Sequence, residues 1–133
     1  MKRKLKVQVD WCDHNYAACI TDHVDGIVVV TEKTYEGLMK ELSQALKQHI
    51  KSMDAAPEWL QQEDYDLSCS FTASASLQMA LAYTTLAAIS RVTGIRQAQL
   101  SHYANATSRP MEQQWGRIVS GLHQIGRACM AVQ

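Results

Sequence analysis

The sequence predicts an α+β protein, with a small N-terminal antiparallel sheet carrying one packed helix, followed by an all-α domain. Three observations favour this class. Apolar and polar residues alternate over residues 5–11 and 65–71, which is the period of half-buried strands. Residues 34–50 repeat apolar side chains at spacings of three and four, as an amphipathic helix does. From residue 72 onward the chain is rich in alanine and helical in period, so we predict two domains, 1–71 and 72–133.

The first half begins with three strands. After the alternating "LKVQVDW", the turn residues of "CDHN" reverse the chain into "YAACITD", which predicts a hairpin. A second turn, "HVDG", contains an Asp-Gly pair and leads into "IVVVT". Because this run is apolar and β-branched, we expect it to lie centrally in the sheet.

A helix and a fourth strand complete the sheet domain. Thr34 is suited to cap the helix, because its hydroxyl can accept from the free amides of the first turn, and Glu36 suits the helix dipole. The connector "SMDAAPEWLQQEDYD" predicts one short turn near Trp59, followed by the fourth strand, "YDLSCSF". The apolar positions of the helix are Leu38, Leu42, Ala45, Leu46, His49 and Ile50.

Four helices are predicted in the second half. The first begins at Ser74 or Ser76, and the second runs from Thr84 or Thr85 to Gly94. The third covers "RQAQLSHYANA", and after "TSRP" a long helix extends from about residue 111 to 131. The apolar side of this last helix is formed by Trp115, Ile118, Val119, Leu122 and Ile125.

The second and third of these helices have the pattern of a helix-turn-helix. Both are short, a glycine marks the turn between them, and Ile89, Ile95 and Leu100 are placed to hold them together. The polar side chains at the start of the third helix then face outward, where this motif contacts the major groove. These residues are Arg96, Gln97, Ala98, Gln99, Ser101 and His102.

The chemistry of these side chains suits base recognition. Glutamine can bond both edge groups of adenine, arginine suits guanine or phosphate, and Ala98 can contact a thymine methyl. We expect Arg91, Arg109 and Arg117 to position the domain on phosphates. The alternative is that the glutamine-rich helix is only a solvated face of a small helical domain.

The segment "LAAISRVTGIRQAQLSHYANATSRP" resembles the helix-turn-helix of phage-repressor-type (XRE-like) regulators. That pattern has a hydrophobic-small pair, three residues, Gly, a β-branched residue and a reading helix that ends near Asn-Gly and Pro. Two positions depart from it: Ile89-Ser90 replaces the usual Leu-Ala, and Asn105-Ala106 replaces Asn-Gly. Neither departure removes a side chain expected to read bases.

The first half resembles HicB antitoxins in "HVDG", "IVVVT" and "TYEGLMKEL". The resemblance implies a partial ribonuclease-H-like fold that masks a small, basic, RNA-cleaving HicA toxin, joined to a domain that represses its own operon by binding operator DNA. Under it, Asp22, Asp25 and Glu32 are expected toxin contacts. The sequence leaves the contact surface open.

The charge distribution agrees with two different partners. Residues 1–70 carry eight Lys/Arg and twelve Asp/Glu, a balance of −4, whereas residues 84–133 carry five Arg and one Glu, a balance of +4. Residues 7–70 alone have four basic and twelve acidic residues, a balance of −8. An acidic surface suits a basic partner, although ordinary surface charge is an equally good explanation.

Other classes of site are expected to be absent. No stretch is apolar enough for a membrane span or a signal peptide, so we expect a cytoplasmic protein. The spacing of Cys12, His14, Cys19 and His23 fits no zinc pattern, and no cofactor is expected. Asp10 lies where ribonuclease-H folds place a metal-binding acid, but a nuclease needs several converging carboxylates, and Glu36 and Glu41 are not evidently near it. We therefore expect that the protein is not an enzyme.

Three functions therefore stay open: the HicB-like antitoxin repressor, an orphan helix-turn-helix regulator whose first half senses a ligand or only dimerises, and a nuclease. A homodimer is expected because such repressors read paired half-sites, and a higher oligomer is left open. The expected interface is the last helix, although the sheet edges offer another. The residues expected to form it are Val119, Leu122, Ile125, Met130 and Val132, with Gly116, Gly121 and Gly126 allowing close approach.

Overall fold

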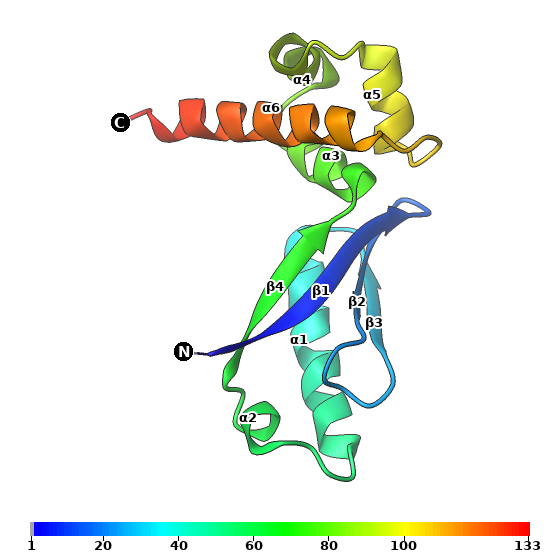
Figure 1. Ribbon diagram of the computed structural model, residues 1–133, viewed down its shortest axis with the longest axis vertical. Helices are drawn as coiled ribbons and strands as arrows, with labels where there is room; N and C mark the ends of the chain where they lie inside the picture. Colours follow the sequence, from blue (N-terminus) through cyan, green and yellow to red (C-terminus); the bar gives the residue numbers. More distant parts are fainter. Residues whose placement is uncertain (1) are drawn as a thin grey trace. The chain divides into compact units, whose positions relative to one another are not determined.

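The computed structural model describes residues 2–133, which divide into two compact units, one ending at Thr72 and the other spanning Ala73–Gln133 (Figure 1). The N-terminal unit contains β1 (Arg3–Cys12), β2 (Asn15–Ile20), β3 (Val28–Glu32), α1 (Tyr35–Ser52), α2 (Glu58–Gln61) and β4 (Tyr65–Phe71). The C-terminal unit contains α3 (Ala73–Leu81), α4 (Leu86–Thr93), α5 (Gln97–Ala104) and α6 (Glu112–Met130). The predicted α+β class with an N-terminal sheet is confirmed.

The sheet has the strand order β3-β2-β1-β4. β1, β2 and β3 form the predicted antiparallel meander, but β4 pairs with β1 in parallel. The prediction of a wholly antiparallel sheet was therefore wrong. The physical reason is the connection: the chain crosses over through α1 and α2 before it returns, which delivers β4 in the same direction as β1.

The apolar strand β3 lies at an edge of the sheet, not at its centre as predicted. Ile27 and Val29 are each 54% exposed. A meander places the third strand beside the second, and the other side of β1 is taken by β4. The run of β-branched residues thus reflects a preference for extended backbone, which does not determine where in the sheet a strand lies.

A tight hairpin joins β1 to β2. Its two loop residues, Asp13 and His14, have φ of 51° and 63°, and Cys12 pairs with Asn15 across the turn. Positive φ at both central positions is the geometry of a type I′ turn, whose twist matches that of the flanking strands. The hairpin therefore fixes the register between β1 and β2.

One face of the sheet is covered by α1. Thr34 caps this helix as predicted, its Oγ1 accepting a 3.0 Å hydrogen bond from the backbone N–H of Gly37. The helix buries four of its predicted apolar positions, whereas Ala45 and His49 are only half-buried. The core of the unit comprises Leu5, Val7, Val9, Tyr16, Ala18, Ile20, Val24, Val28, Leu38, Leu42, Leu46, Ile50 and Leu60.

The C-terminal unit has its own core among its four helices. Thr85 caps α4 by accepting from the N–H of Ala88 at 3.1 Å, and Gly94 ends that helix in the left-handed conformation, with φ of 73°. Both were predicted. The α3 helix begins at Ala73, one residue before the earliest predicted start. The buried core residues are Leu77, Ile89, Ile95, Leu100, Tyr103, Ala104 and Ile118.

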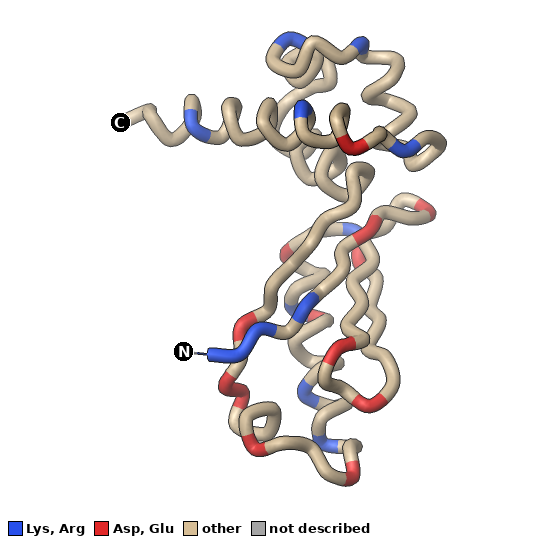
Figure 2. Tube along the Cα trace, viewed as in Figure 1, with Lys and Arg blue, Asp and Glu red and all other residues tan. Residues whose placement is uncertain are grey.

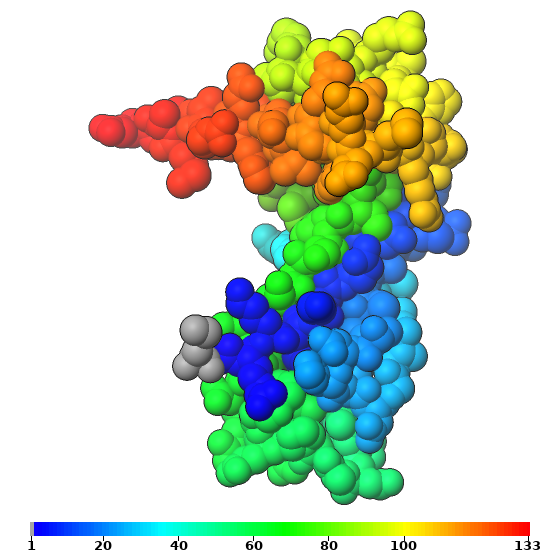
Figure 3. All heavy atoms as spheres, viewed as in Figure 1, coloured from blue at the N-terminus to red at the C-terminus, as the bar shows by residue number. Residues whose placement is uncertain are grey.

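The long helix α6 packs on this core over only part of its length. A Cβ added to Gly121 would lie 2.6 Å from Cγ2 of Thr93, so Gly121 permits the close approach of α6 to α4 within one chain. A Cβ at Gly116 or Gly126 would meet nothing within 4 Å. The last turn of α6 stands clear of the other helices of its unit (Figure 3), and Met130 and Val132 are 86% and 79% exposed.

Candidate nucleic-acid interface

The helices α4 and α5 are joined by a three-residue turn, Gly94-Ile95-Arg96. Ile95 is buried, and its backbone is held by two hydroxyls. Ser90 Oγ donates to the carbonyl oxygen of Ile95 at 2.6 Å, while Thr93 Oγ1 accepts from its N–H at 3.2 Å. Thr93 in turn donates to the carbonyl oxygen of Ile89 at 2.7 Å. The orientation of α5 relative to α4 is therefore fixed by packing and by hydrogen bonds.

The two faces of α5 differ in character. Leu100, Tyr103 and Ala104 are buried against the core of the unit. Leu100, Ile89 and Ile95 are all buried, so the three residues predicted to hold the helix pair together do so. The exposed side chains gather at the start of α5, where its first-turn amides have no side-chain cap. The exposed residues among those predicted to read DNA are Arg96, Gln97, Ala98 and His102.

The other two predicted reading residues are less accessible. Gln99 and Ser101 are half-buried, and Ser101 Oγ accepts a 3.4 Å hydrogen bond from Asn105 Nδ2. Of the six predicted positions, four are thus exposed and two are half-buried. A helix of period 3.6 turns part of any continuous polar run toward its own core, which explains the difference.

Two polar residues at the end of α5 were missed by the sequence analysis. Asn105 and Thr107 are both exposed, and Thr107 contacts His102 twice. The Thr107 hydroxyl donates to the carbonyl oxygen of His102 at 3.1 Å, and Nδ1 of His102 lies 3.0 Å from Thr107 Oγ1. Asn105 follows Ser101 by four residues, about one helical turn. This spacing could have identified it as a neighbour of the predicted reading residues.

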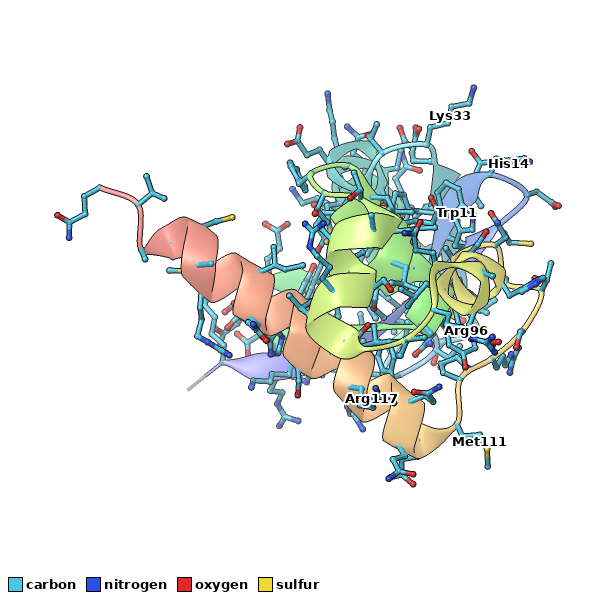
Figure 4. All side chains as sticks on the ribbon, turned by 90° about the horizontal axis from the view of Figure 1, so that it is seen from above. Trp11, His14, Lys33, Arg96, Met111 and Arg117 are labelled. Carbon is cyan, nitrogen blue, oxygen red and sulfur yellow. The ribbon has the colours of Figure 1, made fainter. Side chains whose placement is uncertain are left out.

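The arginines of the C-terminal unit differ in environment. Arg91, Arg96, Arg109 and Arg117 are all exposed, but Arg117 on α6 (Figure 4) also donates from Nη2 to the carbonyl oxygen of Thr93 at 2.7 Å. Residues 73–133 contain five arginines and one acid, Glu112, a balance of +4. Figure 2 shows this contrast with the acidic residues spread over the N-terminal unit. The C-terminal unit thus combines a basic surface with an exposed polar helix start.

The three expected toxin contacts do not form one cluster. Asp22 and Asp25 lie in the loop before β3, and Glu32 is the last residue of that strand. Because a strand rises about 3.3 Å per residue, the two ends of β3 are roughly 13 Å apart. Asp22 lies 3.4 Å from His23, Asp25 accepts from His49 through its backbone oxygen at 2.6 Å, and Glu32 accepts from the N–H of Lys33 at 3.3 Å.

A cluster of aromatic and basic side chains, also missed by the sequence analysis, joins several elements of the N-terminal unit. The guanidinium carbon of Arg3 lies 5.0 Å from the ring centre of Trp59, a cation–π contact. His23 and Tyr65 meet the same indole edge-on, at 5.4 and 6.5 Å between ring centres. Burial raises the pKa of Tyr65, and the nearby Glu63 raises it further. This cluster fixes the loop before β3 against α2 and β4.

Among residues 2–133, no three His, Cys, Asp or Glu side chains lie close enough together to share a metal ion. Cys12 and His14 belong to the β1–β2 hairpin, whereas Cys19 and His23 lie at the other end of β2. Asp10 accepts hydrogen bonds from Thr72 Oγ1 at 2.9 Å and from the N–H of Trp11 at 2.7 Å. Its carboxylate oxygen is thus engaged by the sheet itself.

Over residues 2–133, the structure contains no helix with the length and apolarity needed to cross a bilayer. Comparisons with family models, curated proteins and solved structures found no match to this chain.

Proposed function

We propose that the protein is a DNA-binding repressor that uses α4 and α5 as a helix-turn-helix, with α5 in the major groove. The observation that carries the proposal is the exposed set Arg96, Gln97 and Ala98 at the start of α5, on a helix whose opposite face is buried. A reading helix needs this combination, because base-edge hydrogen bonds require side chains held in fixed positions.

The basic residues around α5 would supply contacts with DNA that do not depend on the base sequence. Arg91 and Arg109 are exposed and lie before and after the reading helix, where they would neutralise phosphates. A two-fold dimer would present two such helices to half-sites one DNA turn, roughly 34 Å, apart. The exposed Met130 and Val132 favour the end of α6 as its interface.

We further propose that the N-terminal unit binds a small basic toxin, so that the whole chain acts in the cytoplasm as the antitoxin of a type II toxin-antitoxin pair. Two observations support this part of the proposal: the resemblance to HicB antitoxins, and the excess of eight acidic over basic residues in residues 7–70. Charge complementarity of this kind accelerates association and disfavours acidic partners.

The DNA part is tested by fluorescence-anisotropy titration at fixed salt. The probes are the DNA immediately upstream of the protein's own reading frame and a random duplex of equal length. The proposal predicts that the upstream DNA binds at least about a thousandfold more tightly, the lower end of the usual ratio of specific to non-specific affinity. Equal affinity for both duplexes would contradict it.

The antitoxin part is tested by co-expressing the tagged protein with the product of a short neighbouring reading frame. A stable complex in which the ribonuclease activity of that product is lost is the expected result. If the protein binds the upstream DNA specifically but neither forms a complex nor lowers ribonuclease activity, the antitoxin part is wrong and the repressor part stands.

One observation favours the orphan regulator as a second candidate. The N-terminal unit has an open hollow of about 560 Å³ between the end of α1 and α2, lined by Lys47, Lys51, Leu60 and Glu63 among others. Its two lysines suit a small anionic ligand. However, the salt bridge from Lys47 to Glu63 at 3.3 Å partly neutralises the positive charge of the hollow. A small anionic metabolite that changes operator affinity would favour this candidate.

A further inference from the structure

The free edge of β3 presents unpaired backbone groups at two known positions. The two-residue hairpin makes Cys12–Asn15 a hydrogen-bonded pair, and such pairs then alternate along an antiparallel ladder. On this alternation β2 bonds to β1 through its odd-numbered residues and to β3 through its even-numbered ones. Since Ala18 pairs with Val30, the N–H and C=O of Val29 and Thr31 point away from β2, toward the free edge.

The side chains at this edge leave it open to pairing with another strand. Val29 and Thr31 are exposed on the face of the sheet opposite α1, and Ile27, just before the strand, is also 54% exposed. β3 contains neither proline nor lysine, the residues that commonly protect an edge. The opposite edge differs, because the exposed positions of β4 are the polar residues Asp66, Ser68 and Ser70.

The charge around β3 indicates which kind of strand would add to it. Residues 21–36 contain four acids, Asp22, Asp25, Glu32 and Glu36, and one cation, Lys33. The acids flank the strand at both ends. Antiparallel pairing with β3 of a second copy would bring two acid-rich segments together, with four acids and only Lys33 as a cation on each chain, so the net interaction would be repulsive. A basic partner strand meets opposite charges instead.

We propose that the edge of β3 binds an extended, basic segment of a protein partner as a fifth strand, through the backbone groups of Val29 and Thr31. This inference deepens the antitoxin part of the proposed function and rests on it for the biological identity of the partner. Main-chain hydrogen bonds would supply affinity, and Val29 together with the flanking acids would select a strand that alternates apolar and basic residues.

The test measures amide hydrogen exchange by NMR on the full chain, alone and with a short capped peptide of alternating lysine and valine. In the free protein, the amides of Val28 and Val30 are expected to be protected and those of Val29 and Thr31 to exchange fast. The peptide should protect Val29 and Thr31. A matched peptide of alternating glutamate and valine should protect neither residue.

Two variants separate recognition of the β3 backbone from electrostatic attraction between the peptide and the acidic residues. Val29→Pro removes an outward N–H without removing a bond to β2, and proline is tolerated at such edge positions. It should weaken peptide binding by about tenfold, which corresponds to the loss of one hydrogen bond. Val29→Ile keeps both the N–H and an apolar β-branched side chain, so it should bind the peptide about tenfold more tightly than Val29→Pro.

The outcomes separate a failure of the edge-binding proposal from a failure of the antitoxin proposal. Absence of protection at Val29 and Thr31, protection along β4 instead, or equal protection by the glutamate peptide would each overturn the inference, even if Val29→Pro fails to fold. If the neighbouring gene product is nevertheless masked, the antitoxin proposal stands and its contact lies elsewhere. If the peptide protects Val29 and Thr31 but the protein does not inhibit the neighbouring gene product, the β3 edge is a binding site whose partner is not that toxin.

Discussion

Nη2 of Arg117 on α6 donates a 2.7 Å hydrogen bond to the carbonyl oxygen of Thr93, the last residue of α4. Nη1 of the same guanidinium donates to Gln114 Oε1 at 3.1 Å. The last carbonyls of a helix have no partner within that helix, so Arg117 satisfies one of them. This residue, predicted as a phosphate contact, therefore also links α6 to the helix that precedes the reading turn.

Replacing Arg117 with alanine is expected to lower the free energy of unfolding of the C-terminal unit by about 1–2 kcal/mol, because the Thr93 carbonyl loses a charged donor. Urea denaturation followed by helical circular dichroism measures this change. The matched control is Arg91→Ala, an exposed arginine on α4, which should change stability by less than about 0.5 kcal/mol. Equal losses in the two variants would show that the contact with Thr93 contributes nothing.

Gly121 and Gly126 form a matched pair on one helix. Gly121→Ala should destabilise the protein by about 1–2 kcal/mol, since its Cβ would lie 2.6 Å from Thr93 Cγ2 and 3.1 Å from Val92 Cγ2. Gly126→Ala should stabilise it by about 0.5–1 kcal/mol, because alanine is the better helix former and the added Cβ meets nothing within 4 Å. Thermal denaturation of both variants is the measurement. The same sign of change in both would contradict the packing of α6 on α4.

Ala106, which follows α5, has a φ of 59°. A left-handed conformation costs a residue with a Cβ roughly 1–2 kcal/mol, and glycine avoids this cost while losing some chain entropy on folding. Ala106→Gly is therefore expected to raise the free energy of unfolding by about 0.5–1 kcal/mol, as measured by urea denaturation. Lower stability in this variant would mean that Ala106 is not left-handed in solution.

Local sequence predicted the elements that depend on local interactions. The caps at Thr34 and Thr85 and the termination at Gly94 each follow from one side chain and the backbone next to it. The cores were predictable for the same reason, because Ile89 and Leu100 follow the helical period that buries them. The left-handed Ala106 also lies where the sequence departs from the usual Asn-Gly.

Features that depend on distant residues were not predictable from one sequence. The edge position of β3 is set by β4 pairing with β1, which brings Arg3 beside Tyr65 across more than sixty positions of the chain. The contact of Arg117 with Thr93 depends in the same way on how α6 crosses α4. For the candidate site, the sequence identified the exposed start of α5 but could not distinguish a phosphate contact from a helix cap at Arg117.

The most direct test of the DNA-reading account compares Gln97→Ala with the unchanged protein on the upstream DNA and on the random duplex, by anisotropy at fixed salt. Gln97 is exposed at the first position of α5, where a lost base contact costs about 1–3 kcal/mol. The account predicts that affinity for the upstream DNA falls by roughly 5- to 150-fold, while affinity for the random duplex is unchanged. Unchanged affinity for the upstream DNA, or an equal loss on both duplexes, would contradict the assignment of α5 as the reading helix.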